Sequence, residues 1–181
     1  MTNVLLVEHV LGLVRLEQLS KPKKENFKLT LKSAFHVDFV QVFARLEHQT
    51  QMQTKLEKYL KNFGYTLDYL SSGSPIFQLP SLYTFSSDSI ALAHFVKEKQ
   101  IETLVDLCSG SGVVGLEIVD TIEVKNLYMV ELQEELSLMS GRSAEFSKTN
   151  TTITALNCNV VGVSDKLPPA DVVVVNPPYF K

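Results

Sequence analysis

A run of four valines, Val172–Val175, ends in the tetrapeptide Asn176-Pro177-Pro178-Tyr179, and this junction limits what the chain can fold into. A short, unbroken run of β-branched residues is typical of a strand buried in a parallel sheet. Proline has no backbone N–H and also restricts the residue before it, so a central strand cannot continue through positions 177 and 178. We therefore expect a strand over 171–175, with Asn176 held in a fixed direction at its carboxyl end.

Upstream, a glycine turn, Cys108-Ser109-Gly110-Ser111-Gly112, follows another expected strand and precedes an expected helix. Glycine lets the backbone turn sharply and lets a carboxylate, ribose or phosphate approach it closely. The segment Gly110–Gly115 also fits the G-x-G-x-x-G pattern, and Glu131 ends the next strand where a ribose-binding acid is expected. The turn therefore predicts a nucleotide-like cofactor, and a nicotinamide dehydrogenase is one candidate.

Strand and helix patterns alternate between residues 87 and 175. The first element is a helix that Ser87 or Asp88 is expected to cap and that runs to about residue 99. Later strands are expected at 103–107, 126–131, 152–157 and 171–175, and later helices at 113–119 and 134–148. Strands that are joined by helices form a parallel sheet covered on both faces, so the expected fold class is α/β.

The loop Ser71–Pro75 is expected to separate two parts of the chain, because Gly, Ser and Pro sustain neither a helix nor a core. Before it, residues 27–43 show the pattern of a β-hairpin, and residues 44–63 have the spacing of a helix that ends at Gly64. We expect an N-terminal α+β extension of unknown role over 1–70 and a core over 76–181.

Two features distinguish the dehydrogenase from other cofactor-dependent enzymes. Asp106 lies in the strand before the glycine turn, where it can orient the turn or meet a cationic cofactor such as S-adenosylmethionine. The Asn176 side chain and the Pro177 carbonyl are two acceptors that can hold the hydrogens of one amino group, and Tyr179 offers a flat face for a purine. This arrangement predicts methyl transfer to a planar amino nitrogen; the other interpretation is a strand stopped by prolines, with Tyr179 in the core.

At these residues the chain resembles a known family. Leu104–Gly112 resembles the first motif of class I S-adenosylmethionine-dependent methyltransferases, and Asn176–Tyr179 resembles their acceptor motif for an amino nitrogen. Tyr83–Ala93, Val130–Leu136 and the terminal Asn-Pro-Pro-Tyr-Phe are similar to bacterial enzymes that methylate the exocyclic amine of an adenine in the valine tRNA anticodon loop. The resemblance covers about residues 76–181 and implies a Rossmann-like sheet, S-adenosylmethionine as the cofactor and adenine in tRNA as the acceptor.

The resemblance also implies roles for individual residues. The methionine end of the cofactor would lie against Asp106, Gly110 and Gly112, with Thr84 and Asp88 nearby, and Glu131 would bind the ribose hydroxyls. Leu132 would lie against the adenine, and Asn159 would stand near its amine. Two positions depart from the family pattern: Asn159 replaces an Asp, and Cys108 replaces a glycine.

In the family, the Asn-Pro-Pro-Tyr motif ends the fourth strand of a seven-stranded sheet, so the resemblance implies an incomplete sheet of about four core strands here. Such a sheet would expose one flank of Val172–Val175, which residues 1–70, a second chain or a homo-oligomer would have to cover. Two other functions therefore stay open. One is a catalytically incomplete module that binds cofactor or a partner, and the other is methylation of a glutamine amide in a protein.

Charge and composition add weaker indications. Residues 1–70 have a net charge of +3 and residues 71–181 one of −6. Nucleic-acid binding usually needs a denser basic face than the Lys21–Lys24 cluster, so this cluster is a weak candidate for binding nucleic acid. The apolar stretch Val4–Leu16 is interrupted by charged residues, so neither a signal peptide nor a membrane span is expected. The four histidines show no metal-ligand spacing, and two cysteines favour the reducing cytoplasm.

Overall fold

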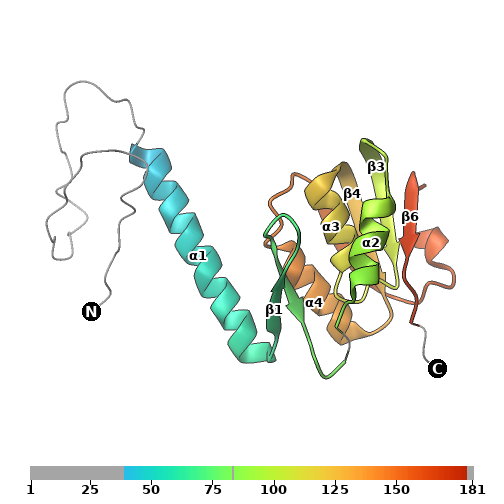
Figure 1. Ribbon diagram of the computed structural model, residues 1–181, viewed down its shortest axis with the longest axis horizontal. Helices are drawn as coiled ribbons and strands as arrows, with labels where there is room; N and C mark the ends of the chain where they lie inside the picture. Colours follow the sequence, from blue (N-terminus) through green and yellow to red (C-terminus); the bar gives the residue numbers. More distant parts are fainter. Residues whose placement is uncertain (1–38, 83, 179–181) are drawn as a thin grey trace, which may run out of the picture. The chain divides into compact units, whose positions relative to one another are not determined.

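The centre of the protein is a parallel sheet, shown in the computed structural model, which describes residues 39–82 and 84–178 (Figure 1). The strands are β3 (Gln100–Leu107), β4 (Glu123–Glu131), β5 (Thr152–Asn157) and β6 (Val172–Val175), in the order β5-β4-β3-β6. Each neighbouring pair is parallel. This confirms the expected α/β fold with four core strands; β3 and β4 each begin three residues earlier than the sequence pattern suggested.

Helices α2 (Ser87–Phe95), α3 (Val113–Thr121) and α4 (Glu134–Ala144) connect the strands. The main core lies between α2, α3 and the sheet, where Leu104, Leu127 and Met129 are completely buried. Apolar side chains at alternate strand positions enter this core because successive residues of a strand face opposite sides. The opposite face carries a smaller core of Val105, Val130 and Val163, the last from the short 3-10 helix η1 (Val163–Lys166).

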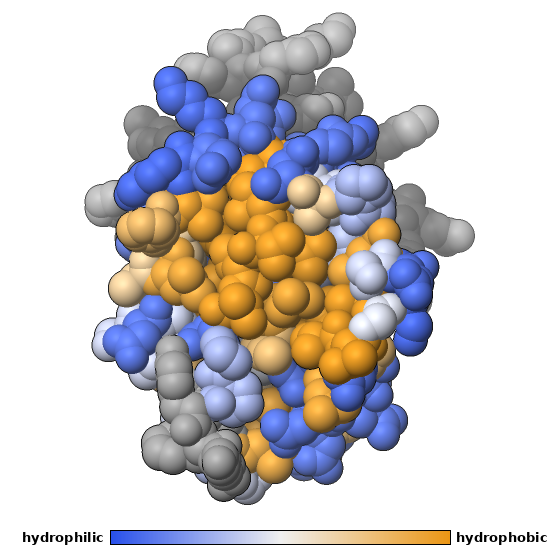
Figure 2. Space-filling model, turned by 90° about the vertical axis from the view of Figure 1, so that its right-hand side faces the viewer, coloured by the Kyte–Doolittle hydropathy of each residue, from blue (hydrophilic) through white to orange (hydrophobic). Residues whose placement is uncertain are grey.

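Strand β6 lies at the edge of the sheet and is covered on one flank by the described residues. Val174 packs into the main core and is 5% exposed, whereas Val173 is 54% and Val175 48% exposed. Val160 and Val161 are also exposed, and Figure 2 shows a broad apolar area on this side of the molecule. Within residues 39–82 and 84–178, the expectation of a sheet covered on both faces is therefore not met over β6, while the expected exposed flank is present.

A hairpin that the sequence pattern did not reveal precedes the sheet. Strands β1 (Thr66–Tyr69) and β2 (Pro75–Gln78) pair in antiparallel fashion across the loop that was expected to be a boundary. Phe77 of β2 is completely buried against Met139 of α4. The residues from Val40 onward belong to one compact unit.

Helix α1 (Phe39–Phe63) is longer than expected. Residues 39–43 were expected to form a strand but are helical, because strand propensity differs from helix propensity by less than about 1 kcal/mol per residue and is easily overridden. The rest of the expected hairpin, and the segment Val4–Leu16, lie outside the described residues. The end of α1 packs through Tyr59 on Phe77 and Phe146, and the Arg142 guanidinium lies 3.7 Å from the Phe63 ring centroid.

We expect Leu127→Ala to lower the free energy of unfolding by about 2–5 kcal/mol, because Leu127 is completely buried between the sheet and α3. Leu138→Ala is the matched control, since Leu138 is 50% exposed on α4. Urea unfolding of both variants measures the difference. Equal losses in the two variants would contradict the assignment of the core to this layer.

Candidate functional site

The register of the parallel strands brings the candidate residues to one edge of the sheet. Leu107, the last residue of β3, pairs with Val130 of β4 on one side and with Val175 of β6 on the other. The residues that follow these three are Cys108, Glu131 and Asn176. The glycine turn, Glu131 and the Asn-Pro-Pro-Tyr motif therefore share the carboxyl edge of the sheet, where open α/β folds bind ligands.

Two glycines of the turn have left-handed backbone conformations for different reasons. Gly112 has φ +83°, and a Cβ atom there would lie 2.8 Å from Met129 Sδ and 3.0 Å from Ser140 Cβ. Gly110 has φ +55°, but a Cβ atom there would meet no heavy atom of the described chain within 4 Å. Gly112 is thus required for packing under the turn, whereas the backbone at Gly110 faces open space that a ligand can occupy.

Cys108 adopts the same left-handed region, with φ +56°, at the position where the resemblance predicts a glycine. A non-glycine residue in this conformation costs roughly 1–2 kcal/mol, so the turn tolerates the cysteine under strain. Burial raises the pKa of the Cys108 thiol, and the charges of Glu131 and Asp106 raise it further. The thiol is therefore protonated at neutral pH and is a poor nucleophile.

Glu131 ties the glycine turn to the end of β4. Its Oε2 accepts a hydrogen bond of 2.8 Å from the Gly110 N–H, and its Oε1 accepts one of 2.9 Å from the Gln133 N–H. Glu131 is 7% exposed, while the neighbouring Leu132 is 65% exposed and presents an apolar side chain at the same edge. An acid at this strand end therefore shapes the turn in addition to offering oxygens to a ligand.

Asp106 is buried beneath the turn rather than displayed at its surface. It is 1% exposed, and its Oδ2 accepts a hydrogen bond of 2.9 Å from the Gly115 N–H in the first turn of α3. Burial raises the pKa of Asp106 to about 7; the Gly115 hydrogen bond lowers it and the Glu131 charge raises it. Asp106 was expected either to orient the turn or to meet a cationic cofactor. Its contact with Gly115 agrees with the first of these roles.

The Asn-Pro-Pro-Tyr motif is described as far as Pro178. Asn176 is partly buried, and its Nδ2 donates a hydrogen bond of 3.1 Å to Ser89 Oγ on α2. Pro177 is exposed directly after β6, and Tyr179 lies outside the described residues. Asn176 is thus fixed at the same edge as the glycine turn by a contact that the sequence pattern did not predict.

Three remaining candidates lie at the surface. Thr84 and Asp88 are exposed, and within residues 39–82 and 84–178 neither side chain forms a hydrogen bond to the glycine turn. The N-cap of α2 is Ser86, not Ser87 or Asp88, and it makes no side-chain cap hydrogen bond in the described region. Asn159 is exposed after β5, and its Oδ1 accepts a hydrogen bond of 2.8 Å from the Val161 N–H.

Other polar residues at this edge were missed by sequence reasoning. The Ser109 and Ser111 hydroxyls are buried in the glycine turn and have no hydrogen-bond partner among the residues that the structure describes. Asn157 Nδ2 donates to the carbonyl oxygens of Glu131 (3.0 Å) and Leu132 (2.8 Å). The serines alternate with the glycines, a signal that was available, but the role of Asn157 depends on the pairing of β5 with β4.

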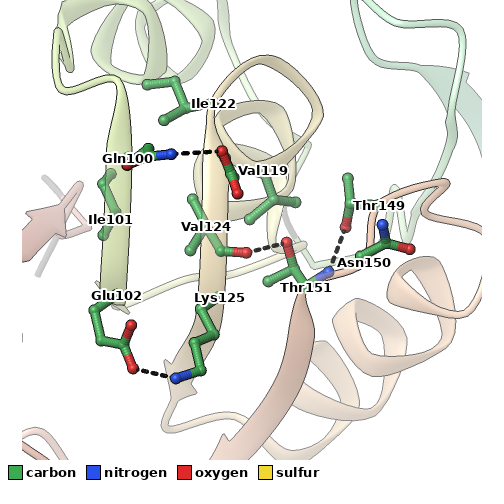
Figure 3. Close-up of a pocket in the computed structure, with 11 residues that line it drawn as sticks. Gln100, Ile101, Glu102, Val119, Ile122, Val124, Lys125, Thr149, Asn150 and Thr151 are labelled. Atoms are coloured by element: carbon green, nitrogen blue, oxygen red, sulfur yellow. Dashed lines mark hydrogen bonds and ion pairs between the residues drawn. The ribbon is translucent and has the colours of Figure 1, made fainter.

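A depression of about 660 Å³ lies at the opposite edge of the sheet, where β3 and β4 begin (Figure 3). Its four charged and amide side chains on β3 and β4 are paired with one another, since Lys125 contacts Glu102 at 2.6 Å and Gln100 contacts Glu123 at 2.9 Å. We therefore place the candidate site at the carboxyl edge. Within the described residues, no cluster of His, Cys, Asp or Glu can hold a metal ion, and none of the helices has the length and apolar character to cross a bilayer.

Sequence comparisons find two relatives of uncharacterised function. The chain is 25% identical over 101 residues to the MG259 homologue of Mycoplasma pneumoniae and 28% identical over 95 residues to MG259 of Mycoplasma genitalium. These matches cover 56% and 52% of this chain but 22% and 20% of the two relatives, so the chain spans about a fifth of their length. No family model matches the sequence.

Solved structures show what the fold is similar to. A Methanocaldococcus jannaschii tRNA m1G37 methyltransferase matches with a TM-score of 0.52 and 16% identity, over 64% of this chain and 36% of that chain. The M. jannaschii Trm5 structure in complex with adenosine matches with a TM-score of 0.51 and 15% identity, over 63% and 35% of the two chains. The sheet and helices described here therefore have the Rossmann-like fold of these methyltransferases.

We expect Gly112→Ala to destabilise the protein by at least about 1 kcal/mol more than Gly73→Ala. Both glycines are left-handed, with φ +83° and +81°, so the backbone strain of alanine is similar in the two variants. Only at Gly112 does the new Cβ atom collide with Met129 and Ser140, because Gly73 has open space around it. Urea unfolding measures both, and equal losses would contradict the packing role of Gly112.

A second prediction concerns the pH dependence of stability. Because the pKa of Asp106 rises from 3.8 to about 7 on folding, the native state keeps a proton that the unfolded chain has already lost. The stabilising contribution of Asp106 is present below pH 3.8 and disappears as the pH rises through about 7. We expect the wild-type advantage over Asp106→Asn in unfolding free energy to fall across this range. An advantage that is independent of pH would contradict the assignment.

Proposed function

We propose that this chain binds S-adenosylmethionine at the carboxyl edge of its sheet and takes part in methyl transfer to the exocyclic amine of adenine in tRNA. The observation that supports this most directly is the strand register. Cys108, Glu131 and Asn176 each follow one of three paired strand residues, which brings the glycine turn beside the acceptor motif. Methyl transfer needs a donor and an amino acceptor in one place, and alignment of the reacting atoms is a large part of such catalysis.

The residues present fit this cofactor. Ser109 and Ser111 offer two buried hydroxyls that have no other hydrogen-bond partner among the described residues, and the backbone at Gly110 faces open space. Glu131 places an acidic group beside the turn, which favours a cationic ligand. When bound, S-adenosylmethionine supplies an electrophilic methyl group on its sulfonium; Ser109, Ser111, Gly110 and Glu131 would hold it.

The acceptor motif supplies the other half of the chemistry. Asn176 and the Pro177 carbonyl are hydrogen-bond acceptors that can receive the two hydrogens of an amino group and turn its lone pair toward the methyl donor. The amine of adenine is conjugated with its ring, so contacts that favour a more tetrahedral nitrogen act mainly in the transition state. This geometry requires no covalent intermediate on the protein and no metal ion.

The choice of tRNA is supported by two observations of unequal weight. The two M. jannaschii neighbours are a tRNA m1G37 methyltransferase and Trm5, but at 16% and 15% identity the likeness extends to the fold alone. The choice of adenine as the acceptor is supported by the Asn-Pro-Pro-Tyr motif. It is also supported by the similarity of Tyr83–Ala93 and Val130–Leu136 to the valine tRNA enzymes. A glutamine amide of a protein presents the same planar nitrogen, so it is the competing acceptor.

The exposed flank of β6 favours a second candidate function. Val173 and Val175 are about half exposed, which is unusual for valines of a parallel strand, and an open edge next to them is a site for further pairing. A module with this flank uncovered would bind the cofactor and transfer methyl groups only when a partner covers β6.

Calorimetric titration with S-adenosylmethionine tests the cofactor. We expect Glu131→Gln to weaken binding by about tenfold, because it removes a carboxylate that organises the Gly110 and Gln133 amides. Glu134→Gln is the matched control, since Glu134 is exposed at the first residue of α4. Binding of NAD in place of S-adenosylmethionine would favour the interpretation as a nicotinamide dehydrogenase and contradict this proposal.

Transfer of a labelled methyl group from S-adenosylmethionine to unmodified tRNA, or to a glutamine-containing protein, then tests the acceptor. Label in adenine of the tRNA supports the proposed reaction, and label in the protein supports the competing acceptor. Cofactor binding without transfer to either substrate supports the module that needs a partner.

A further inference from the structure

We propose that Ser89 is a positioning residue for this reaction: it holds the side chain of Asn176 at the carboxyl end of β6. The inference rests on the proposed function, because Ser89 would act by positioning Asn176, a residue that the proposed reaction uses. Ser89 Oγ accepts a hydrogen bond of 3.1 Å from Asn176 Nδ2, between residues that are 87 positions apart in the chain.

The burial of this contact protects the hydrogen bond from competition by water. Ser89 is 2% exposed and Asn176 is partly buried, so water competes weakly for the hydrogen bond. A buried hydroxyl without its partner would lose part of its hydration at a cost, and this favours the state in which the two side chains meet. The serine stands on the inner side of α2, as does the buried Ala93 one turn later.

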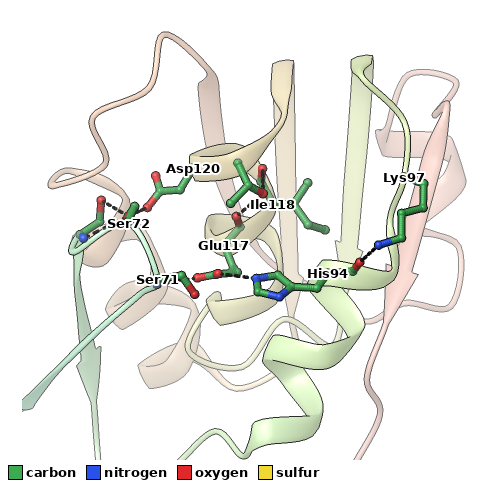
Figure 4. Close-up of polar contacts among 9 residues, drawn as sticks. Ser71, Ser72, His94, Lys97, Glu117, Ile118 and Asp120 are labelled. Atoms are coloured by element: carbon green, nitrogen blue, oxygen red, sulfur yellow. Dashed lines mark hydrogen bonds and ion pairs between the residues drawn. The ribbon is translucent and has the colours of Figure 1, made fainter.

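Helix α2 is itself anchored at its other end (Figure 4). His94 Nε2 lies 2.9 Å from Glu117 Oε1 on α3, and Glu117 Oε2 accepts a hydrogen bond of 3.0 Å from the Ser71 N–H. Glu117 is completely buried. Burial raises the pKa of Glu117, but the hydrogen bonds from Ser71 and His94 outweigh this and hold the pKa below its usual value.

The anchored helix gives Ser89 a fixed place relative to the sheet. Glu117 connects α3 with α2 and with the turn between β1 and β2, and Lys97 Nζ donates to the His94 carbonyl at 2.6 Å. Ser89 therefore transmits the position of α2 to Asn176, which follows an edge strand with one flank that the described residues leave exposed. A side chain at such a strand end gains its precision from this contact with the helix.

The hydrogen bond also sets the direction of the Asn176 amide. An amide is planar and carries its nitrogen and oxygen on opposite sides, so an Nδ2 that donates to α2 turns Oδ1 away from that helix. In the proposed reaction, Oδ1 is the atom that receives a hydrogen of the amino group. Loss of the Ser89 hydroxyl removes this contact and lowers the fraction of molecules with this alignment.

The kinetic test compares Ser89→Ala with Ser87→Ala, which removes an exposed hydroxyl from the first residue of the same helix. We expect Ser89→Ala to lower kcat for methyl transfer to tRNA by about two- to tenfold, the worth of one hydrogen bond, and to leave the Kd for S-adenosylmethionine unchanged. Ser87→Ala is expected to keep both values. A purely structural role for Ser89 would weaken cofactor binding as well as turnover.

A double-mutant cycle of Ser89→Ala and Asn176→Ala, followed by urea unfolding, tests the contact without any assay of activity. We expect the two substitutions to be non-additive, because each removes one partner of the same hydrogen bond. Additive losses would overturn the inference. Wild-type protein that fails to transfer methyl groups contradicts the proposed function, whereas active wild-type protein with an unchanged kcat in Ser89→Ala contradicts the role of Ser89 alone.

Discussion

The parallel pairing of β3 with both β4 and β6 is the constraint on which the rest of the structure depends. Because Leu107 is level with Val130 and Val175, three segments that are far apart in sequence end at one edge. The backbone hydrogen bonds of a parallel ladder fix this alignment, and a slip by one residue would turn every buried side chain to the other face. The candidate site is therefore a consequence of strand register more than of any single side chain.

Buried polar contacts then give the edge its shape. Asp106 holds the first turn of α3 through Gly115, Glu131 holds the glycine turn through Gly110, and each lies within a few residues of a strand end. Such groups cost free energy to bury unless they are hydrogen-bonded, so the conformation that satisfies them is strongly preferred. The left-handed backbone of Cys108 is strained, and burial raises the pKa of Asp106; both kinds of feature are common at functional sites.

The helix layer supports the residue that follows β6. Among the residues that the structure describes, strand β6 pairs with β3 alone, and Val173 and Val175 are half exposed, so the strand by itself gives Asn176 limited support. The contact with Ser89 connects it to α2, which the buried Glu117 fixes through His94. A glycine turn fixed by carboxylates and an asparagine fixed by a helix form a pair of separately supported groups, which is what the proposed methyl transfer would need.

The sequence by itself determined the alternation of strands and helices, the glycine turn and the strand that ends at the prolines, because periodicity, steric freedom and the missing proline N–H are local properties. It did not predict the hairpin β1-β2, whose four-residue strands carry too weak a pattern, or the helical start of α1. Only the tertiary structure decided that Asp106 is buried, that Thr84 and Asp88 are exposed, and that Ser89 meets Asn176. These features depend on which elements pack together, and packing joins residues whose separation along the chain leaves no local signal.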